Sequence, residues 1–405
     1  DELAVGLCLV RFMLGNKAAK PIRDIVRKPG AAELFMGMQP PHSELAHVDL
    51  HTGLKWKEDI CEASVLEYGD ILEFAAVFQD ALIGEQTVDA VEPLLRITAA
   101  ALQNESFLSV HTAEIGAGGY PGKAHCNPEV LLADEGKFRE FVETFKKYDV
   151  EICALAAHGN PVHPDAAKAE GYDRDFRNAV LLAEKLGLDT VIGFSGCPGD
   201  HDGAKYPNWV TCPWPDDFLK ILDWQWSEKL IPYWKKTAAF AEAHGVTHIA
   251  FEMHPGFCVY NPETMLKLRA EVGPVLGANF DPSHLIWQGI DPVAAVRYLK
   301  GAIYHVHAKD TKIDKYNTAQ IGVLDTKHYS DELNRAWVFR TVGFGNGEGY
   351  WRDFVSNLRL CGYDRVLSIE HEDSVMTIDE GLRKAVEFLK PIVMTEDKPR
   401  TMSWA

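Results

Sequence analysis

Four apolar, strand-like segments of the sequence end in carboxylates or imidazoles. The segments IAFEMHP, GANFDPSH, IYHVHAKD and LSIEHED supply Glu252, His254, Asp281, His284, His305, His307, Lys309, Asp310, Glu370, His371 and Glu372. Because side chains alternate along a strand, His305, His307 and Lys309 share one face. A charged side chain in a protein interior is costly unless it is paired or binds a metal. Any one of these motifs fits an ordinary polar surface, but together they indicate a common site.

One divalent cation would explain all four strand ends at once. Glu252, Asp281, His307 and Glu370 would form an oxygen-rich ligand set with a net charge of about −3. Such a set favours one Mn²⁺, Mg²⁺ or Co²⁺ over a structural zinc, which prefers sulfur and nitrogen. His305, two residues before His307, is expected to lie deeper, as a buried histidine rather than a ligand.

Strands and helices must alternate to bring these ends together. The expected strands are residues 107–116, 150–159, 190–196, 248–255, 275–284, 302–310 and 366–373. The expected helices are residues 137–147, 175–186, 229–244, 262–272, 292–299, 350–361 and 378–389. Alternation of this kind predicts a parallel sheet. Two long segments after strands, 197–227 and 311–349, are interpreted as lids or binding loops.

Seven strand–helix units are one short of an α/β (β/α)8 TIM barrel, which is the predicted fold. The catalytic barrel is assigned to residues 105–405, and the missing first strand to residues 3–12. The irregular N-terminal region, residues 1–104, has an expected helix at 71–103. It is either an insertion after the first strand or a small appended domain, and the sequence leaves both open.

The amino-acid composition limits which cellular compartment and which binding partners are expected. The 405 residues carry a net charge of −18, which repels nucleic acid and favours divalent cations. None of the eight cysteines forms a Cys-x-x-Cys pair, as expected for reduced thiols in a cytoplasmic protein. The apolar start, residues 3–14, is too short for a membrane span and lacks a cleavage site, so neither a signal peptide nor a membrane partner is predicted.

From about residue 112 to residue 405 the chain resembles the xylose isomerase-like TIM barrels, the group of sugar phosphate isomerases and epimerases. This group includes D-tagatose 3-epimerase, inosose dehydratase and the C-glycoside deglycosidase α subunit. The resemblance lies in EIGAGGYPG, HGNPVHP, FSGCPG, FEMHPG, NFDPSH, HVHAKD and SIEHED. It implies that Glu252, Asp281, His307 and Glu370 hold the metal, with the two glutamates as proton donor and acceptor. It also implies a role for His284, either behind the ligands or against the substrate.

Other residues near the strand ends are candidates for catalysis or substrate binding. His158 is a possible additional base or hydroxyl contact, or else it caps the following turn. Lys309 would neutralise a developing oxyanion or pair with a rim carboxylate. Glu114 would bond a sugar hydroxyl or make a structural pair. The remaining predicted substrate contacts are His254 and Arg340, the latter within the long segment 311–349.

The metal would polarise a carbonyl and an adjacent hydroxyl and stabilise an enediolate. The expected function is isomerisation or epimerisation of a non-phosphorylated sugar, oxo-sugar or cyclitol, because EIGAGGYPG lacks the Lys-Ser/Thr pair of a phosphate loop. The alternative is β-elimination by a lyase, dehydratase or deglycosidase from an inosose or a 3-oxo-glycoside. A trinuclear-zinc DNA repair endonuclease and an inactive binding scaffold are the other classes considered. A homo-oligomer or a companion subunit remains open.

Overall fold

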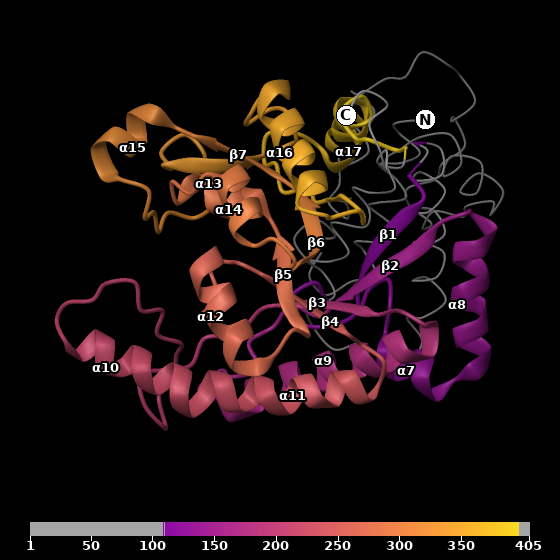
Figure 1. The fold of residues 1–405 in the computed structure, drawn as a ribbon, viewed down its shortest axis with the longest axis horizontal. Coiled ribbons are helices and arrows are strands. Elements are labelled where there is room, and N and C mark those ends of the chain that lie inside the picture. The colour runs from indigo at the N-terminus through magenta and orange to yellow at the C-terminus, as the bar shows by residue number, and fades with distance from the viewer. Residues whose placement is uncertain (1–107, 109, 397–405) are drawn as a thin grey trace, which may run out of the picture. The chain divides into compact units, whose positions relative to one another are not determined.

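The described residues form a nearly closed barrel of parallel strands. The computed structural model describes residue 108 and residues 110–396. Within them, seven parallel strands form one sheet in the order β1-β2-β3-β4-β5-β6-β9 (Figure 1). The strands are β1 (Thr112–Gly116), β2 (Glu151–Ala156), β3 (Thr190–Gly193), β4 (His248–Glu252), β5 (Leu276–Phe280), β6 (Ile303–Ala308) and β9 (Ser368–Ile369). Every predicted strand in this part of the chain is therefore confirmed, with shorter bounds.

Twelve helical segments lie among the strands in the described part of the chain, and several of them pack on the sheet. They are α7 (Pro128–Ala133), α8 (Glu135–Lys147), α9 (Ala166–Leu186), α10 (Asp217–Trp224), η4 (Gln225–Leu230), α11 (Ile231–Ala243), α12 (Pro262–Val272), α13 (Pro282–Trp287), α14 (Pro292–Tyr298), α15 (Lys315–Ile321), α16 (Glu348–Leu360) and α17 (Ile378–Leu389). Helix α9 packs on β2 and β3, α12 on β5 and α17 on β9. Strands β3 and β5 are buried along their whole length, as expected for a parallel sheet covered on both faces.

Capping side chains explain where several helices begin. Asn261 caps α12 by accepting the backbone N–H of Thr264, and Asp291 caps α14 in the same way. A proline follows each cap at the first helical turn, where its missing N–H is no loss. Helix α9 ends at Gly187, which adopts φ 74° in the left-handed region. These boundaries agree with the predicted ones.

Strand β5 is shorter than predicted because Asp281 caps the next helix. The expected strand was residues 275–284, but β5 ends at Phe280. The Asp281 carboxylate accepts the backbone N–H of Ser283 at 2.8 Å, and α13 follows immediately. His284 therefore lies on a helix, one turn beyond the strand end. This helix was missed because the segment PSHLIW is only six residues long.

Both long segments contain regular structure, which corrects their interpretation as loops alone. Segment 197–227 includes α10 and the start of η4, a stretch of π-helix. Segment 311–349 includes α15 and a two-stranded antiparallel sheet of β7 (Asp310–Ile313) and β8 (Trp337–Arg340). The Asp310 carboxylate accepts backbone N–H groups from Gly343, Gly345 and Asn346 and so ties the end of this excursion to the barrel.

The predicted first strand, residues 3–12, and the predicted helix 71–103 lie outside the described residues. Within the described sheet, β1 and β9 are the two ends. The Ser368 hydroxyl on β9 nevertheless donates a hydrogen bond of 3.1 Å to Glu114 on β1. The interior faces of the end strands therefore approach each other. Among the described helices, none has the length and apolar character needed to cross a membrane.

Candidate metal centre

The four predicted metal ligands meet at the carboxyl ends of four strands. Glu252 ends β4, Asp281 directly follows β5, His307 lies in β6 and Glu370 directly follows β9. One ligand atom from each of the four lies within 4.8 Å of the others. Three of these side chains are buried, whereas the Glu370 side chain is 31% exposed. Of the four, Glu370 is therefore the side chain that solvent reaches most.

The contacts within this cluster leave unfavourable interactions that a bound cation would remove. The buried Asp281 Oδ2 makes no hydrogen bond, although His284 Nε2 lies 3.3 Å away and Lys309 Nζ lies 3.6 Å away. Burial raises the pKa of Asp281 to about 7, and the charges of Glu252 and Glu370 add to this effect while Lys309 opposes it. Three carboxylates held this close repel each other. A divalent ion would relieve that repulsion and supply the missing partner of Asp281.

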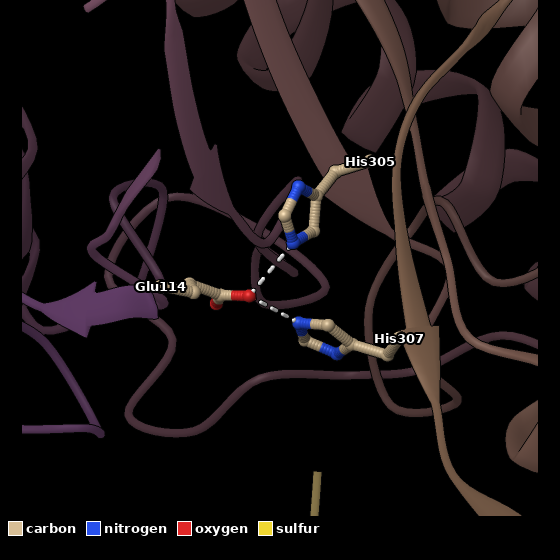
Figure 2. A group of neighbouring side chains, drawn as sticks. All are labelled: Glu114, His305 and His307. Atoms are coloured by element: carbon tan, nitrogen blue, oxygen red, sulfur yellow. Dashed lines mark hydrogen bonds and ion pairs between the residues drawn. The ribbon is translucent and has the colours of Figure 1, made fainter. Parts of the chain in front are cut away.

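Figure 2 shows a second cluster, in which Glu114 faces two histidines of β6. Glu114 Oε2 lies 2.9 Å from His305 Nε2 and 2.8 Å from His307 Nε2. The opposite ring nitrogen, His307 Nδ1, lies 2.8 Å from Glu370 Oε2. Burial alone would lower the pKa of His307, but the charges of Glu114 and Glu370 raise it well above its usual value. Strand β1 and strand β6 are not neighbours in the sheet, so these contacts cross the barrel interior.

Glu252 is held between two histidines. His284 Nε2 lies 2.9 Å from Glu252 Oε1, and His158 Nε2 lies 3.0 Å from Glu252 Oε2. Burial would raise the pKa of Glu252, but hydrogen bonds from His158 and His284 hold it well below its usual range. His284 also lies 3.3 Å from Asp281 Oδ2 and is almost fully buried. The structure thus places both histidines against the ligands.

Lys309 is a buried ammonium group surrounded by carboxylates. It lies 3.2 Å from Glu370 Oε1 and 2.5 Å from Glu372 Oε2. Burial would lower the pKa of Lys309, but Glu370 and Glu372 raise it well above its usual value. The same contact acts on Glu370: burial favours its neutral form, yet Lys309 and His307 lower the pKa of Glu370 to about 2. This arrangement matches the predicted pairing with a rim carboxylate.

Two predicted substrate contacts have other partners. Arg340 Nε donates to Asp373 Oδ2 at 3.0 Å. His254 packs against His284, with ring centroids 4.1 Å apart, and its Nδ1 lies 2.6 Å from the Pro255 carbonyl oxygen. Burial lowers the pKa of His254 to about 4. Whether any of these residues contacts substrate stays a prediction.

Three features beside the cluster were not predicted from the sequence: Asn279, Ser368 and an aromatic pair. Asn279 Nδ2 lies 3.1 Å from His307 Nε2. It precedes Asp281 by two residues, so the alternation of side chains along the strand could have indicated that both face the same side. Phe194 and Phe257 stack with ring centroids 4.2 Å apart, and Phe194 lies 4.6 Å from the His158 ring. These rings follow β3 and β4 and form an apolar wall beside His158 and His254.

Comparisons with known proteins agree with this architecture. A family model described as "Xylose isomerase-like TIM barrel" matches residues 111–392. YfiH of Bacillus subtilis, an uncharacterized protein, is 41% identical over 290 residues, which cover 71% of this chain and 92% of YfiH. Inosose dehydratase of Mesomycoplasma hyopneumoniae is 24% identical over 252 residues, covering 61% of this chain and 78% of the relative. A Mycobacterium smegmatis xylose isomerase-like TIM barrel protein, solved in complex with magnesium, superposes with a TM-score of 0.51 at 14% identity, covering 74% of this chain and 88% of that one.

Proposed function

Because the chain belongs to the xylose isomerase-like TIM barrel family, we propose that it is a divalent-metal-dependent isomerase or epimerase. Its substrate would be a non-phosphorylated sugar, oxo-sugar or cyclitol. The observation that carries the proposal is the convergence of Glu252, Asp281, His307 and Glu370 within 4.8 Å. These residues would hold one ion, for which Mn²⁺, Mg²⁺ and Co²⁺ are the candidates.

A divalent ion held by these residues would supply Lewis-acid polarisation of a carbonyl and its neighbouring hydroxyl. That polarisation acidifies the adjacent C–H, so a positioned carboxylate can take the proton. Glu370 is the candidate for this step, because its side chain is 31% exposed while the other three are buried, although its oxygens also face Lys309 and His307. Both oxygens of Glu252 are engaged by histidines, so it would exchange protons through His158 or His284.

Where the proton returns decides the product. Return to the opposite face of the same carbon gives an epimer, and return to the neighbouring carbon gives an aldose–ketose isomer. Lys309, 3.2 Å from Glu370 Oε1, would stabilise negative charge that develops on oxygen beside that carboxylate. The apolar wall of Phe194 and Phe257 would pack against the C–H face of the substrate and exclude water.

β-Elimination is the second candidate function. Its first step is the same proton removal, and departure of a β-hydroxyl or β-aglycone then replaces proton return. The similarity to inosose dehydratase over 252 residues supports this candidate. Buried imidazoles such as His158 would serve as proton donors to the departing oxygen.

Solvent exchange with a panel of carbohydrates tests both candidates. Metal-loaded protein is incubated in D₂O with ketoses, inososes and 3-oxo-glucosides, and deuterium incorporation and products are followed by NMR. Exchange next to a carbonyl with a rearranged sugar identifies the isomerase or epimerase, and loss of water or aglycone identifies the lyase. Glu370→Gln should slow exchange about 100-fold or more. Glu263→Gln, a matched change at an exposed carboxylate in the first turn of α12, should leave it near wild type. A metal-loaded protein inert toward the whole panel would refute the proposal.

A further inference from the structure

His307 has carboxylates at both edges of its ring. Nδ1 lies 2.8 Å from Glu370 Oε2, within the four-residue ligand set, and Nε2 lies 2.8 Å from Glu114 Oε2 on the opposite side (Figure 2). A neutral imidazole has one N–H and one lone pair, on different nitrogens. The nitrogen that faces a cation must offer its lone pair, so the proton must sit on the other nitrogen.

We propose that Glu114 is a positioning residue that fixes the tautomer and orientation of His307. An ionised carboxylate can only accept hydrogen bonds, so Glu114 selects the Nε2–H tautomer and leaves the Nδ1 lone pair toward the ligand set. Hydrogen bonds of this kind orient metal-binding histidines and raise their basicity. The inference rests on the proposed metal site and adds a residue from a fifth strand, β1, to it.

Glu114 is itself held in place by other side chains. Its Oε2 also lies 2.9 Å from His305 Nε2 and accepts the Ser368 hydroxyl at 3.1 Å. These contacts come from β6 and β9, so the carboxylate is fixed to both strands that border the ligand set. Three protein side chains therefore contact Glu114 Oε2. This favours the interpretation of Glu114 as a structural pair over its interpretation as a contact to a sugar hydroxyl.

Two other arrangements of the same atoms are less favourable. A second cation between Glu114, His305 and His307 would need lone pairs on both nitrogens of His307, which requires an imidazolate anion. The amide of Asn279 also lies near His307 Nε2, at 3.1 Å. An amide can donate or accept and therefore selects neither tautomer.

The test measures metal binding and the His307 tautomer rather than catalysis. Affinity for Mn²⁺ and Zn²⁺ is measured by calorimetry. ¹⁵N-histidine NMR identifies the tautomer in the Zn²⁺-loaded protein, because Zn²⁺ is a d¹⁰ ion and therefore diamagnetic. In Glu114→Gln the amide can turn either its oxygen or its NH₂ toward Nε2, so the affinity should fall about 10- to 100-fold. Glu263→Gln, a matched change at an exposed carboxylate in the first turn of α12, should bind metal as wild type does.

The outcomes separate this inference from the proposed function. One ion per chain, Nε2–H in wild type and a selective loss in Glu114→Gln support it. Unchanged affinity in Glu114→Gln, an Nδ1–H tautomer, or an equal loss in Glu263→Gln would overturn it while the metal site stands. Two ions in wild type and one in Glu114→Gln would show a second cation site instead. No ion in wild type would refute the proposed function as well. The tautomer is read on wild-type protein, so a misfolded variant does not remove the test.

Discussion

Raising the pH from about 6 to about 8 should tighten the binding of Mn²⁺ to this protein, because two of the four ligands carry protons that the ion must displace. Burial, Glu252 and Glu370 raise the pKa of Asp281 to about 7, so in the metal-free protein this acid is half protonated near neutral pH. The charges of Glu114 and Glu370 raise the pKa of His307 well above its usual value, against the effect of burial.

The size of the effect follows from these two groups. An acid with a pKa of about 7 is roughly 9% ionised at pH 6 and roughly 91% ionised at pH 8, which alone changes the affinity about tenfold. If His307 stays protonated over this range, its displacement adds up to a further factor of about 100. The expected gain therefore lies between about 10-fold and about 1,000-fold, and always in the direction of tighter binding at higher pH.

Calorimetry in two buffers with different ionisation enthalpies measures both the affinity and the number of protons released. Asp281→Asn should release fewer protons and show a shallower pH dependence. Glu263→Gln, which changes an exposed carboxylate in the first turn of α12, should keep the wild-type slope. An affinity that stays flat or falls as the pH rises, or binding without proton release, would show that these ligands are not the protonated groups described above.

Three further predictions concern the barrel that carries the site. Arg365 holds the pKa of the half-exposed Asp189 at about 2, so the stability from this pair is present above about pH 4 and is lost as the pH falls toward 2. Asp189→Asn should therefore lower the melting temperature at pH 7, by an amount that corresponds to less than about 1 kcal/mol of stability, and should lower it less at pH 2. Phe251→Ala removes a fully buried ring of β4 and should reduce the free energy of unfolding in urea by about 3–5 kcal/mol. Gly345→Ala would place a Cβ 2.5 Å from the Asp310 carboxylate, and its melting temperature should fall while that of Gly349→Ala, where a Cβ meets open space, should change less.

The barrel could be predicted from the sequence because each strand carries a local signal. Short β-branched runs, a capping residue such as Asp291 before proline and a glycine such as Gly187 after a helix all act within a few residues. The π-helical stretch of η4 depends instead on distant contacts. The buried Gln225 donates to the carbonyl oxygens of Pro198, Gly199 and Asn208, far earlier in the chain. A local pattern carries no information about such a contact.

The convergence of the four candidate ligands could be predicted for a similar reason, and the contacts around them could not. Parallel strands deliver their carboxyl ends to one rim, so Glu252, Asp281 and Glu370 had to be near each other once the strands were assigned. The partners of each ligand depend on rotamers and on side chains from other strands. Nothing in the sequence around Glu114 indicates that its carboxylate crosses the barrel to His307 rather than facing the rim.

Positive charges inside the barrel explain how three carboxylates can lie close together in the metal-free protein. Glu252, Asp281 and Glu370 would repel one another strongly if all were ionised and unpaired. Protonation of His307 and Asp281, together with the ammonium group of Lys309, offsets most of that charge in the metal-free protein. On the proposed function, a divalent cation would replace those protons, because it would bring two positive charges to within reach of all four predicted ligands. Binding of a cation at this site should therefore release protons from Asp281 and His307. The number of protons released should increase with the fraction of protein that has bound metal.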